Sequence, residues 1–344
     1  MQWSHLEGGF VKAVVLEGRD RIAVRDVPAP SANGKAVVAV ERAGLCGTDL
    51  KILSGAIATR PPLVLGHEVV GRLARAGPRG LIAEGERVLL DPGVTCGRCA
   101  ACLGDRPNLC TNGGLLGRDA DGGFAEFMAV DEGQLHPLPE GIGPDAEAVL
   151  QVLATCVHAQ TRIQVFPGQP AVVVGLGTSG LLHTQLLLLR GADPVIGVTR
   201  SLAKRDRARD LGAHHTVPPE DAEDAVRDLT GGRGADVVVE CVGSAEALRQ
   251  CSALAAPGGS VLVFGTTSPA ADGVPTFEWY FKELDLVNTR GARPRDYVRA
   301  IELAAAGRLR LAPIVTSSYP LDDAPAAFAA CGRPEELKVV LDVV

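Results

Sequence analysis

Short apolar runs dominate the first part of the chain. Between residues 11 and 150, valine-rich segments such as VKAVVLEG, KAVVAVERAG and ERVLLDPG are separated by Gly and Pro. Runs of this length, bounded by turn-forming residues, are typical of strands in an antiparallel sheet. The pattern therefore predicts a β-rich domain in this region.

The pattern changes at residue 171. The segment AVVVGLGTSGLLHTQLLLLRGADPVIGVTR predicts an apolar strand, a glycine turn, an apolar helix and a second strand, which together form a βαβ unit. Gly175, Gly177 and Gly180 fit G-x-G-x-x-G at the start of this helix. In a dinucleotide-binding fold these glycines permit a tight turn, let a pyrophosphate approach the backbone, and allow the helix to pack on the strand. A turn that serves packing alone is the alternative.

Two more apolar segments, DVVVECVG at 236–243 and SVLVFG at 260–265, predict further strands of the same parallel sheet. This context favours a doubly wound Rossmann domain over residues 156–291. Further on, RDYVRAIELAAAG predicts a helix and LKVVLDVV a last strand, and both are assigned to the β-rich domain. We thus predict an α/β chain whose β-rich domain, 1–155 and 292–344, is interrupted by the Rossmann domain.

Charge and hydropathy exclude several functions. The 344 residues carry a formal net charge of −7 and no basic stripe, so we expect neither nucleic acid nor an anionic membrane as a partner. The longest apolar run, LLHTQLLLLR, is interrupted by polar residues and is far shorter than a bilayer span. The first residues, MQWSHLEGGF, lack the basic start and apolar run of a signal peptide. We expect a cytoplasmic protein.

Four of the nine cysteines lie in one polar segment, CGRCAACLGDRPNLC. A disulfide knot, a redox-active cluster and a metal site are three interpretations, but thiols that stay reduced in the cytoplasm favour metal binding or catalysis. The spacing C-x2-C-x2-C-x7-C lets four thiolates surround one zinc ion at about 2.3 Å each, and such a closed site is structural. An iron–sulfur cluster is the main alternative, although its fourth cysteine ordinarily follows more closely. We predict a structural zinc in a lobe at about 91–113, held by Cys96, Cys99, Cys102 and Cys110.

Several motifs occur in an order that resembles a known family. They are GLCGTD at 44–49, LGHEVVG at 65–71, the four-cysteine lobe, DGGFAEF at 121–127 and GLGTSG at 175–180. Over nearly the whole chain they resemble the zinc-dependent medium-chain dehydrogenases/reductases, which include alcohol, threonine, sorbitol and glucose dehydrogenases. The resemblance implies a GroES-like fold for the β-rich catalytic domain, a small-molecule alcohol or carbonyl substrate, and a homodimer or homotetramer.

The same resemblance implies a catalytic zinc. It assigns Cys46 and His67 as ligands, with Glu68 as an adjacent acid that binds the ion in one state and yields to substrate in another. A catalytic zinc keeps one position open for a substrate oxygen. The family's third ligand, a Cys, Glu or Asp, is replaced here by Gln151, so Gln151, Glu68 and water stay open as the third ligand. Glucose dehydrogenases look similar at this position, which favours a sugar or polyol.

Proton transfer involves two further residues. The resemblance places Thr48 where a hydroxyl hydrogen-bonds the substrate alcohol and passes its proton to the cofactor ribose. Lys51 stands where the family often has a histidine, and a protonated lysine has no lone pair to accept a proton. The relay therefore ends at Lys51 or in water, or Lys51 is only a solvated side chain. Nearby Cys156 and His158 we interpret as packing residues.

The end of the second Rossmann strand predicts the cofactor. VIGV is followed by Thr199, Arg200 and Ser201, with no carboxylate to bind the ribose hydroxyls of NAD, while Arg200 can pair with a 2'-phosphate. Lys204 adds positive charge one turn later. We predict NADP(H) in preference to NAD(H). The remaining predicted cofactor residues are Gly175, Gly177, Thr178, Ser179, Gly180, Val263, Phe264, Gly265, Thr289 and Arg290.

These inferences predict a zinc-dependent oxidoreductase that transfers a hydride between NADP(H) and an alcohol or ketone. Two alternatives remain. One is an NAD(P)H reductase of the same fold without a functional catalytic zinc, and the other is a non-catalytic NADPH-binding protein.

Overall fold

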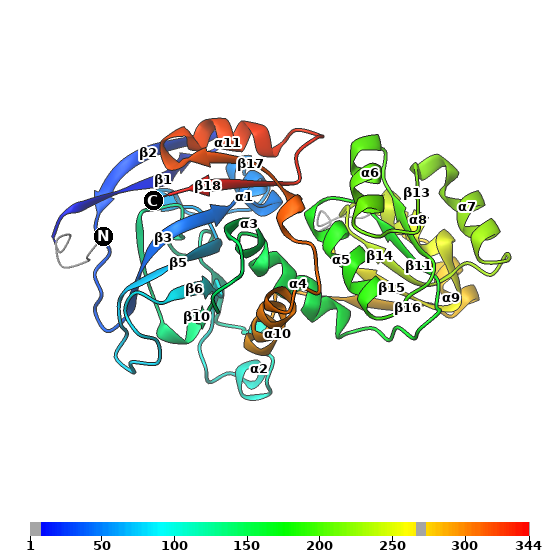
Figure 1. The fold of residues 1–344 in the computed structure, drawn as a ribbon, viewed down its shortest axis with the longest axis horizontal. Helices are drawn as coiled ribbons and strands as arrows, with labels where there is room; N and C mark the ends of the chain where they lie inside the picture. The colour runs from blue at the N-terminus through cyan, green and yellow to red at the C-terminus, as the bar shows by residue number, and fades with distance from the viewer. Residues whose placement is uncertain (1–7, 266–272, 344) are drawn as a thin grey trace. The chain divides into compact units, whose positions relative to one another are not determined.

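The computed structural model describes residues 8–265 and 273–343 (Figure 1). The first seven residues, on which the signal-peptide argument partly depends, lie outside this described part. The chain divides into two compact units. Unit 1 comprises residues 1–154, 293–307 and 311–344, and unit 2 comprises residues 155–292 and 308–310. Among the described residues, no helix is both long and apolar enough to span a bilayer.

Unit 1 is built on β-sheets. A three-stranded sheet has the order β2-β1-β4, and a larger sheet has the order β10-β6-β5-β3-β18-β17, with β9 also paired to β3. The pairs are antiparallel except for β17 and β18, which run parallel. The bounds are β1 Phe10–Gly18, β2 Arg21–Pro28, β3 Ala36–Gly44, β4 Leu63–Val64, β5 Glu68–Arg75, β6 Arg87–Leu90, β9 Phe127–Val130, β10 Leu135–Pro137, β17 Val315–Pro320 and β18 Lys338–Asp342.

Short helices and one small ribbon complete unit 1. Strands β7, Gly93–Val94, and β8, Gly114–Leu115, form the ribbon that brackets the cysteine segment. Helix α11 packs on β2, β17 and β18. Helix α4 begins in unit 1 and ends in unit 2. The helix bounds are α1 Gly47–Leu53, α2 Ala100–Leu103, α3 Pro144–Glu147, α4 Leu150–Gln160, α10 Pro294–Ala305 and α11 Ala324–Cys331.

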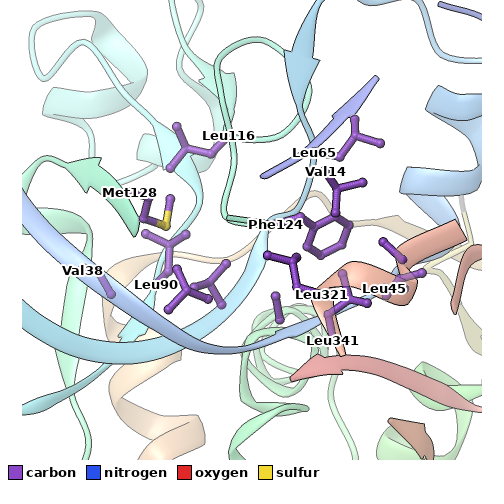
Figure 2. Packing of buried hydrophobic residues seen from close by; sticks show 14 of the residues in the cluster. Val14, Val38, Leu45, Leu65, Leu90, Leu116, Phe124, Met128, Leu321 and Leu341 are labelled. Carbon is purple, nitrogen blue, oxygen red and sulfur yellow. The ribbon is translucent and has the colours of Figure 1, made fainter. Parts of the chain in front are cut away.

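The core of unit 1 holds the segment that leads into α1. Figure 2 shows this packing, in which side chains from several strands and from the C-terminal part of the chain surround Phe124. The Phe124 ring meets Phe328 edge to face, with the ring centroids 6.0 Å apart. Leu45, which directly precedes Cys46, and Ile52, which follows it on α1, are both buried in this cluster. Burial of one such side chain contributes about 1.5 to 3 kcal/mol, so the backbone around Cys46 is firmly held.

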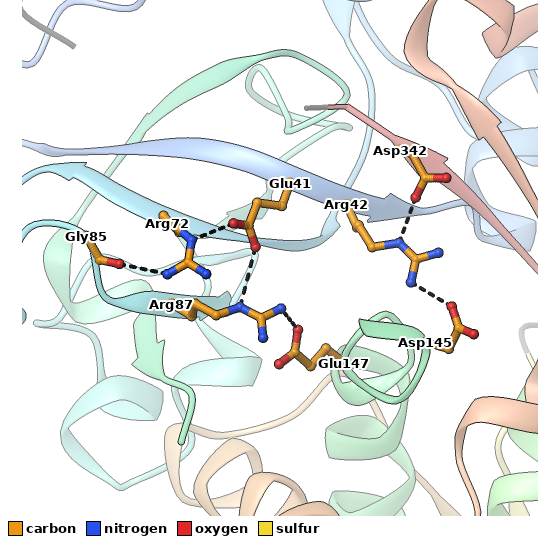
Figure 3. Close-up of polar contacts among 8 residues, drawn as sticks. All are labelled: Glu41, Arg42, Arg72, Gly85, Arg87, Asp145, Glu147 and Asp342. Atoms are coloured by element: carbon orange, nitrogen blue, oxygen red, sulfur yellow. Dashed lines mark hydrogen bonds and ion pairs between the residues drawn. The ribbon is translucent and has the colours of Figure 1, made fainter. Parts of the chain in front are cut away.

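A network of ion pairs joins the larger sheet to α3 (Figure 3). Arg42 on β3 bonds Asp145 and Asp342, each at 2.7 Å. Arg87 on β6 pairs with the buried carboxylate of Glu147 at the end of α3. Burial raises the pKa of Glu147 to about 7, although Arg87 opposes the shift. Because α4 starts only three residues after Glu147, these contacts also fix the first turn of α4.

Unit 2 is a doubly wound parallel sheet, as predicted. Its strand order is β13-β12-β11-β14-β15-β16, and every pair is parallel. The order reverses between β11 and β14, so the carboxyl ends of these strands form the edge where such folds bind nucleotides. The strands are β11 Ala171–Val174, β12 Val195–Val198, β13 His215–Val217, β14 Ala235–Glu240, β15 Ala255–Val263 and β16 Asp285–Asn288. The helices are α5 Thr178–Leu189, α6 Leu202–Asp210, α7 Ala222–Leu229, α8 Ala245–Leu254 and α9 Thr276–Lys282.

Candidate active site and metal centres

The four clustered cysteines converge in unit 1. The sulfur of Cys99 lies 3.5 Å from that of Cys102 and 3.8 Å from that of Cys110. A tetrahedron with zinc–sulfur bonds of about 2.3 Å has edges of about 3.8 Å, so these separations fit one ion. All nine cysteines lie in the described part of the chain and none forms a disulfide, so the disulfide interpretation is wrong.

Backbone groups favour thiolates at this cluster. The N–H groups of Arg98 and Cys99 lower the pKa of Cys96. The N–H groups of Cys102 and Thr111 lower the pKa of Cys99 to about 5. Burial and the neighbouring thiol of Cys99 raise the pKa of Cys102 to about 11. The backbone N–H groups thus favour the thiolate form of Cys96 and Cys99, which is the form that binds a metal.

The second cluster arises from the register of two strands. Gly44 at the end of β3 pairs with Glu68 at the start of β5, which brings Cys46 beside His67. Cys46 is the N-cap residue of α1. The ligand atoms of Cys46, His67 and Glu68 all lie within 4.8 Å of one another. His67 and Glu68 are buried, and Cys46 is half-buried.

Asp49 supports two of these residues. Its Oδ2 accepts the backbone N–H of Cys46 at 2.8 Å, and its Oδ1 lies 3.4 Å from Nδ1 of His67. Burial alone lowers the pKa of His67, but Asp49, together with Cys46, outweighs it and raises that pKa well above its ordinary value. With Nδ1 facing Asp49, Nε2 is the nitrogen available to a metal. Asp49 was not a predicted site residue, although it is part of the GLCGTD motif.

Glu68 has a cationic partner on the last strand. Its Oε2 accepts a hydrogen bond from Nζ of Lys338 at 2.6 Å, and the same ammonium donates to the Leu45 carbonyl at 2.9 Å. Among the described residues, Oε1 of Glu68 is buried without a hydrogen-bond partner. Burial lowers the pKa of Lys338, but the charge and hydrogen bond of Glu68, together with Cys46 and Cys331, outweigh this and raise it. Nothing in the sequence marks Lys338 as a site residue.

Gln151 lies in the first turn of α4. Its side chain is buried, and Nε2 donates to the Tyr297 hydroxyl at 3.4 Å. Tyr297 in turn hydrogen-bonds Asp91, whose pKa burial raises to about 6. Because the amide nitrogen faces Tyr297, the carbonyl oxygen of Gln151 is the atom that can serve as a ligand. Gln151 therefore has the right chemistry for the third ligand.

The two predicted proton-transfer residues share α1. Thr48 and Lys51 are half-buried and lie about one turn apart. Cys156 is fully buried and its thiol contacts the Ser179 carbonyl at 3.9 Å, in keeping with a packing role.

The glycine turn of unit 2 has the geometry of a dinucleotide site. Gly175 has φ +94°, and a Cβ there would lie 2.7 Å from Cγ2 of Val242. A Cβ on Gly177, the N-cap of α5, would meet no atom within 4 Å, so the backbone is open to a ligand. A Cβ on Gly180 would overlap the Gly175 carbonyl oxygen. Thr178 and Ser179 begin α5 between these glycines and so lie at a helix N-terminus, the kind of position that favours a bound anion.

The segment after β12 has no acidic residue. It consists of Thr199, Arg200 and Ser201, and the Ser201 hydroxyl caps α6 by accepting the N–H of Lys204 at 3.4 Å. Arg200 is exposed. The segment thus presents a hydroxyl, a guanidinium and a helix N-terminus.

The residues predicted to hold the nicotinamide follow the next two strands of the sheet edge. The N–H groups of Phe264 and Gly265 donate to the Glu240 carbonyl at 2.9 and 3.0 Å. Among the described residues, the hydroxyl of Thr289 is buried without a hydrogen-bond partner, which suits a ligand that supplies one. The predicted residues are Val263, Phe264 and Gly265 at the end of β15, and Thr289 and Arg290 after β16.

Glu240 organises this edge and was not predicted. It is fully buried at the end of β14. Its Oε1 accepts the N–H groups of Val242 and Gly243, both at 2.7 Å. A Cβ on Gly265 would lie 2.6 Å from its Oε2. The carboxylate therefore holds the residues that directly follow β14, while the Glu240 carbonyl binds those that directly follow β15.

Comparison with known proteins identifies the family. Residues 32–140 match the model of the alcohol dehydrogenase GroES-like domain, and residues 179–306 match that of the zinc-binding dehydrogenases. A Mycobacterium tuberculosis protein assigned as a zinc-binding alcohol dehydrogenase is 32% identical over 96% of this chain and 88% of its own length. A sorbitol dehydrogenase of Halalkalibacterium halodurans is 29% identical over 96% of this chain and 99% of its own.

A solved structure agrees with these matches. A Sinorhizobium meliloti protein assigned to the zinc-binding dehydrogenases, solved with NADP bound, has a TM-score of 0.90 and 34% identity, covering 97% of this chain and 100% of its own. The chain belongs to the zinc-dependent medium-chain dehydrogenase/reductase family. It is an oxidoreductase of the zinc type, with a GroES-like domain and a Rossmann domain, which confirms the predicted fold and family.

Proposed function

We propose that this chain is a zinc-dependent dehydrogenase that transfers a hydride between NADP(H) and an alcohol or ketone, with a sugar or polyol as the favoured substrate. The observation that carries the proposal is the set of Cys46, His67 and Glu68, whose ligand atoms lie within 4.8 Å of one another. When bound, zinc would polarise the substrate oxygen and the nicotinamide would carry the hydride. The sorbitol dehydrogenase among the relatives supports a polyol.

The chain's own residues would hold the metal as follows. Cys46 and His67 supply two ligand atoms, and Asp49 keeps the imidazole oriented from its Nδ1 side. The third protein ligand is the carbonyl oxygen of Gln151 or a carboxylate oxygen of Glu68. The structural ion would bind the cysteine lobe and tie its loop together.

Proton movement would begin at Thr48. Its hydroxyl would accept the proton of the substrate hydroxyl during oxidation while its own proton passes to the cofactor ribose, and the reverse transfers would occur during reduction. Lys51, three residues later on α1, or solvent would complete the relay.

The absence of an acid after β12 and the presence of Arg200 favour NADP(H), and the NADP-bound relative supports this choice. A homodimer or homotetramer is part of the proposal and is tested by light scattering.

The decisive experiment combines metal analysis with a substrate panel. The purified chain should contain two zinc ions, of which Cys46→Ser removes the catalytic ion and all turnover while NADPH binding persists. Cys110→Ser should remove the other ion and lower the melting temperature. Sugars, polyols, hydroxy acids and apolar alcohols are assayed with NADPH or NADP and with NADH or NAD.

The alternatives give different results. A single zinc ion that Cys46→Ser leaves in place, together with full turnover in that variant, would indicate a reductase without a catalytic metal. NADPH binding without turnover on any member of the panel would indicate a non-catalytic NADPH-binding protein.

A further inference from the structure

A buried ion pair lies directly beside the candidate catalytic metal ligands. Nζ of Lys338 is 2.6 Å from Oε2 of Glu68, and their side chains are 3% and 1% exposed. Burying two charges is unfavourable unless both are well satisfied. The ammonium is satisfied by Glu68 and by the Leu45 carbonyl. The carboxylate is satisfied only on one oxygen, since Oε1 has no partner in the described chain.

Strand β3 lies opposite Glu68 and leaves room for the Glu68–Lys338 ion pair. Gly44 on β3 faces Glu68 in the antiparallel register. A Cβ on Gly44 would lie 2.5 Å from Oε2 of Glu68 and 3.3 Å from Cδ of Lys338. The close approach of Glu68 and Lys338 thus depends on a glycine at this position.

The charges around the site balance when Lys338 is included. A thiolate at Cys46 and carboxylates at Asp49 and Glu68 give three negative charges. A divalent ion and the ammonium of Lys338 give three positive charges. Without Lys338 this set would carry one excess negative charge, and the metal would be the one cation of the set left to Glu68.

We propose that Lys338 holds Glu68 away from the catalytic metal, so that Glu68 remains a neighbour of the ion and one coordination position stays open for substrate. This inference rests on the proposed zinc site at Cys46 and His67. Lys338 is a positioning residue, because it acts through Glu68 and touches neither substrate nor cofactor. Removing its charge should let Glu68 bind the ion and close the open position.

The test measures metal release as well as activity. The zinc-loaded chain and its Lys338→Met variant are mixed with a chromogenic chelator, and the time course of zinc release is followed. The kinetic phase that is missing in Cys46→Ser is assigned to the catalytic ion. Lys338→Met should release this ion about tenfold more slowly than the wild type, because the freed carboxylate of Glu68 would add a ligand, and a tenfold change corresponds to about 1.4 kcal/mol. Its kcat should fall, and Lys338→Arg should restore both values towards those of the wild type.

A surface ion pair provides the matched control. Lys12 pairs with Asp322 at 2.7 Å, but their side chains are 46% and 60% exposed. Lys12→Met should leave zinc release and kcat unchanged. Release from Lys338→Met at the wild-type rate or faster would overturn the inference, because a merely structural lysine would at most loosen the site.

Two further variants keep the test valid if Lys338→Met does not fold. Glu68→Gln in the wild-type background should leave the rate of zinc release unchanged, because Glu68 does not bind the ion while Lys338 is present. Zinc release as fast as in His67→Ala would overturn the inference. The double variant Lys338→Met, Glu68→Gln should release zinc at the wild-type rate. Absence of zinc at Cys46 in the wild type would instead contradict the proposed function, so the two failures are distinguishable.

Discussion

At the scale of single residues, the candidate metal site depends on contacts between neighbours of the ligands. Asp49 binds the backbone of Cys46 and faces His67, so one buried carboxylate contacts two candidate ligands, one at the start of α1 and one just before β5. A carboxylate on the far side of a metal-binding imidazole fixes the tautomer and raises its basicity. The ligands therefore depend on a residue that would not itself touch the ion.

Asp49→Asn tests this support. The amide oxygen can still accept the Cys46 N–H, but the negative charge beside His67 is lost. We expect zinc affinity at the catalytic site to fall about tenfold or more, measured by competition with a chelator. The control is Asp121→Asn, because Asp121 also accepts a backbone N–H, that of Val64 at 2.9 Å. Equal zinc affinity in the two variants would show that Asp49 only caps α1.

Arg200 and Thr199 test the cofactor preference. Removing a charge-assisted contact to the 2'-phosphate costs about 1.5 to 3 kcal/mol, which is roughly a ten- to hundredfold loss of affinity. Arg200→Ala should therefore weaken NADPH and leave NADH nearly unchanged, and adding Thr199→Asp should invert the preference in kcat/KM. Arg207→Ala on the last turn of α6 is the control. Equal weakening of both cofactors by Arg200→Ala would assign Arg200 to a solvated basic face.

At the scale of elements, the carboxyl edge of the unit 2 sheet is held by one side chain. Glu240 ends β14 and binds the N–H groups of Val242 and Gly243, while its carbonyl binds Phe264 and Gly265. The ends of β14 and β15 are thereby joined, next to the place where the sheet reverses its order between β11 and β14. Val242, Gly243, Phe264 and Gly265 are thus held in place before a cofactor binds.

Glu240→Ala should loosen this edge. Two partly buried N–H groups lose their acceptor, and each such hydrogen bond contributes about 0.5 to 1.5 kcal/mol. We expect a lower free energy of unfolding in urea and a higher dissociation constant for NADPH, followed by nicotinamide fluorescence. Glu220→Ala at an exposed position is the control. A variant with normal NADPH binding would show that the loops keep their positions without the carboxylate.

The sequence predicts those strands whose residues form a continuous apolar run. KAVVAVERAG and AVVVG became β3 and β11 because apolar side chains occur at the strand period or in a fully buried run. Strand β17, VTSSYP, was not predicted because its residues are polar and half-buried. It is a strand only because it pairs with β18, and that pairing has no signature within the six residues.

Those residues of the candidate site that belong to short sequence motifs were predictable. Cys46, His67 and Glu68 lie in two such motifs, and Gly175 in a third. Lys338 and Tyr297 were not predictable, because they meet Glu68 and Gln151 across 270 and 146 positions of the chain. Contacts of that kind depend on how β18 and α10 pack within unit 1, and no local sequence pattern specifies that packing.

At the scale of the whole molecule, each unit encloses an imidazole in its interior. His136 in unit 1 stacks on Tyr297 with the ring centroids 4.9 Å apart, and burial lowers its pKa to about 4. His183 in unit 2 is fully buried, and burial lowers its pKa to about 3. The unfolded chain therefore binds protons below about pH 6.5 that the folded chain does not bind. Both residues make the folded state less stable as the pH falls through this range.

Two buried carboxyl groups act in the opposite direction. Burial raises the pKa of Asp91 to about 6 and that of Glu147 to about 7. The folded chain thus protonates these groups before the unfolded chain does, and they add stability as the pH falls from neutral towards about 4. The pH dependence of the wild type alone mixes both contributions, so one histidine must be isolated by comparison with a variant.

His136→Phe isolates one of these histidines. Phenylalanine keeps a flat ring against Tyr297 but cannot bind a proton. The free energy of unfolding of the wild type minus that of the variant should be constant above about pH 7 and should fall by about 1.4 kcal/mol per pH unit between about pH 6.5 and 4. Urea unfolding at half-unit steps of pH measures this difference, in which the contributions of Asp91 and Glu147 cancel. A difference that stays constant down to pH 4 would mean that His136 accepts its proton equally well in the folded and the unfolded chain.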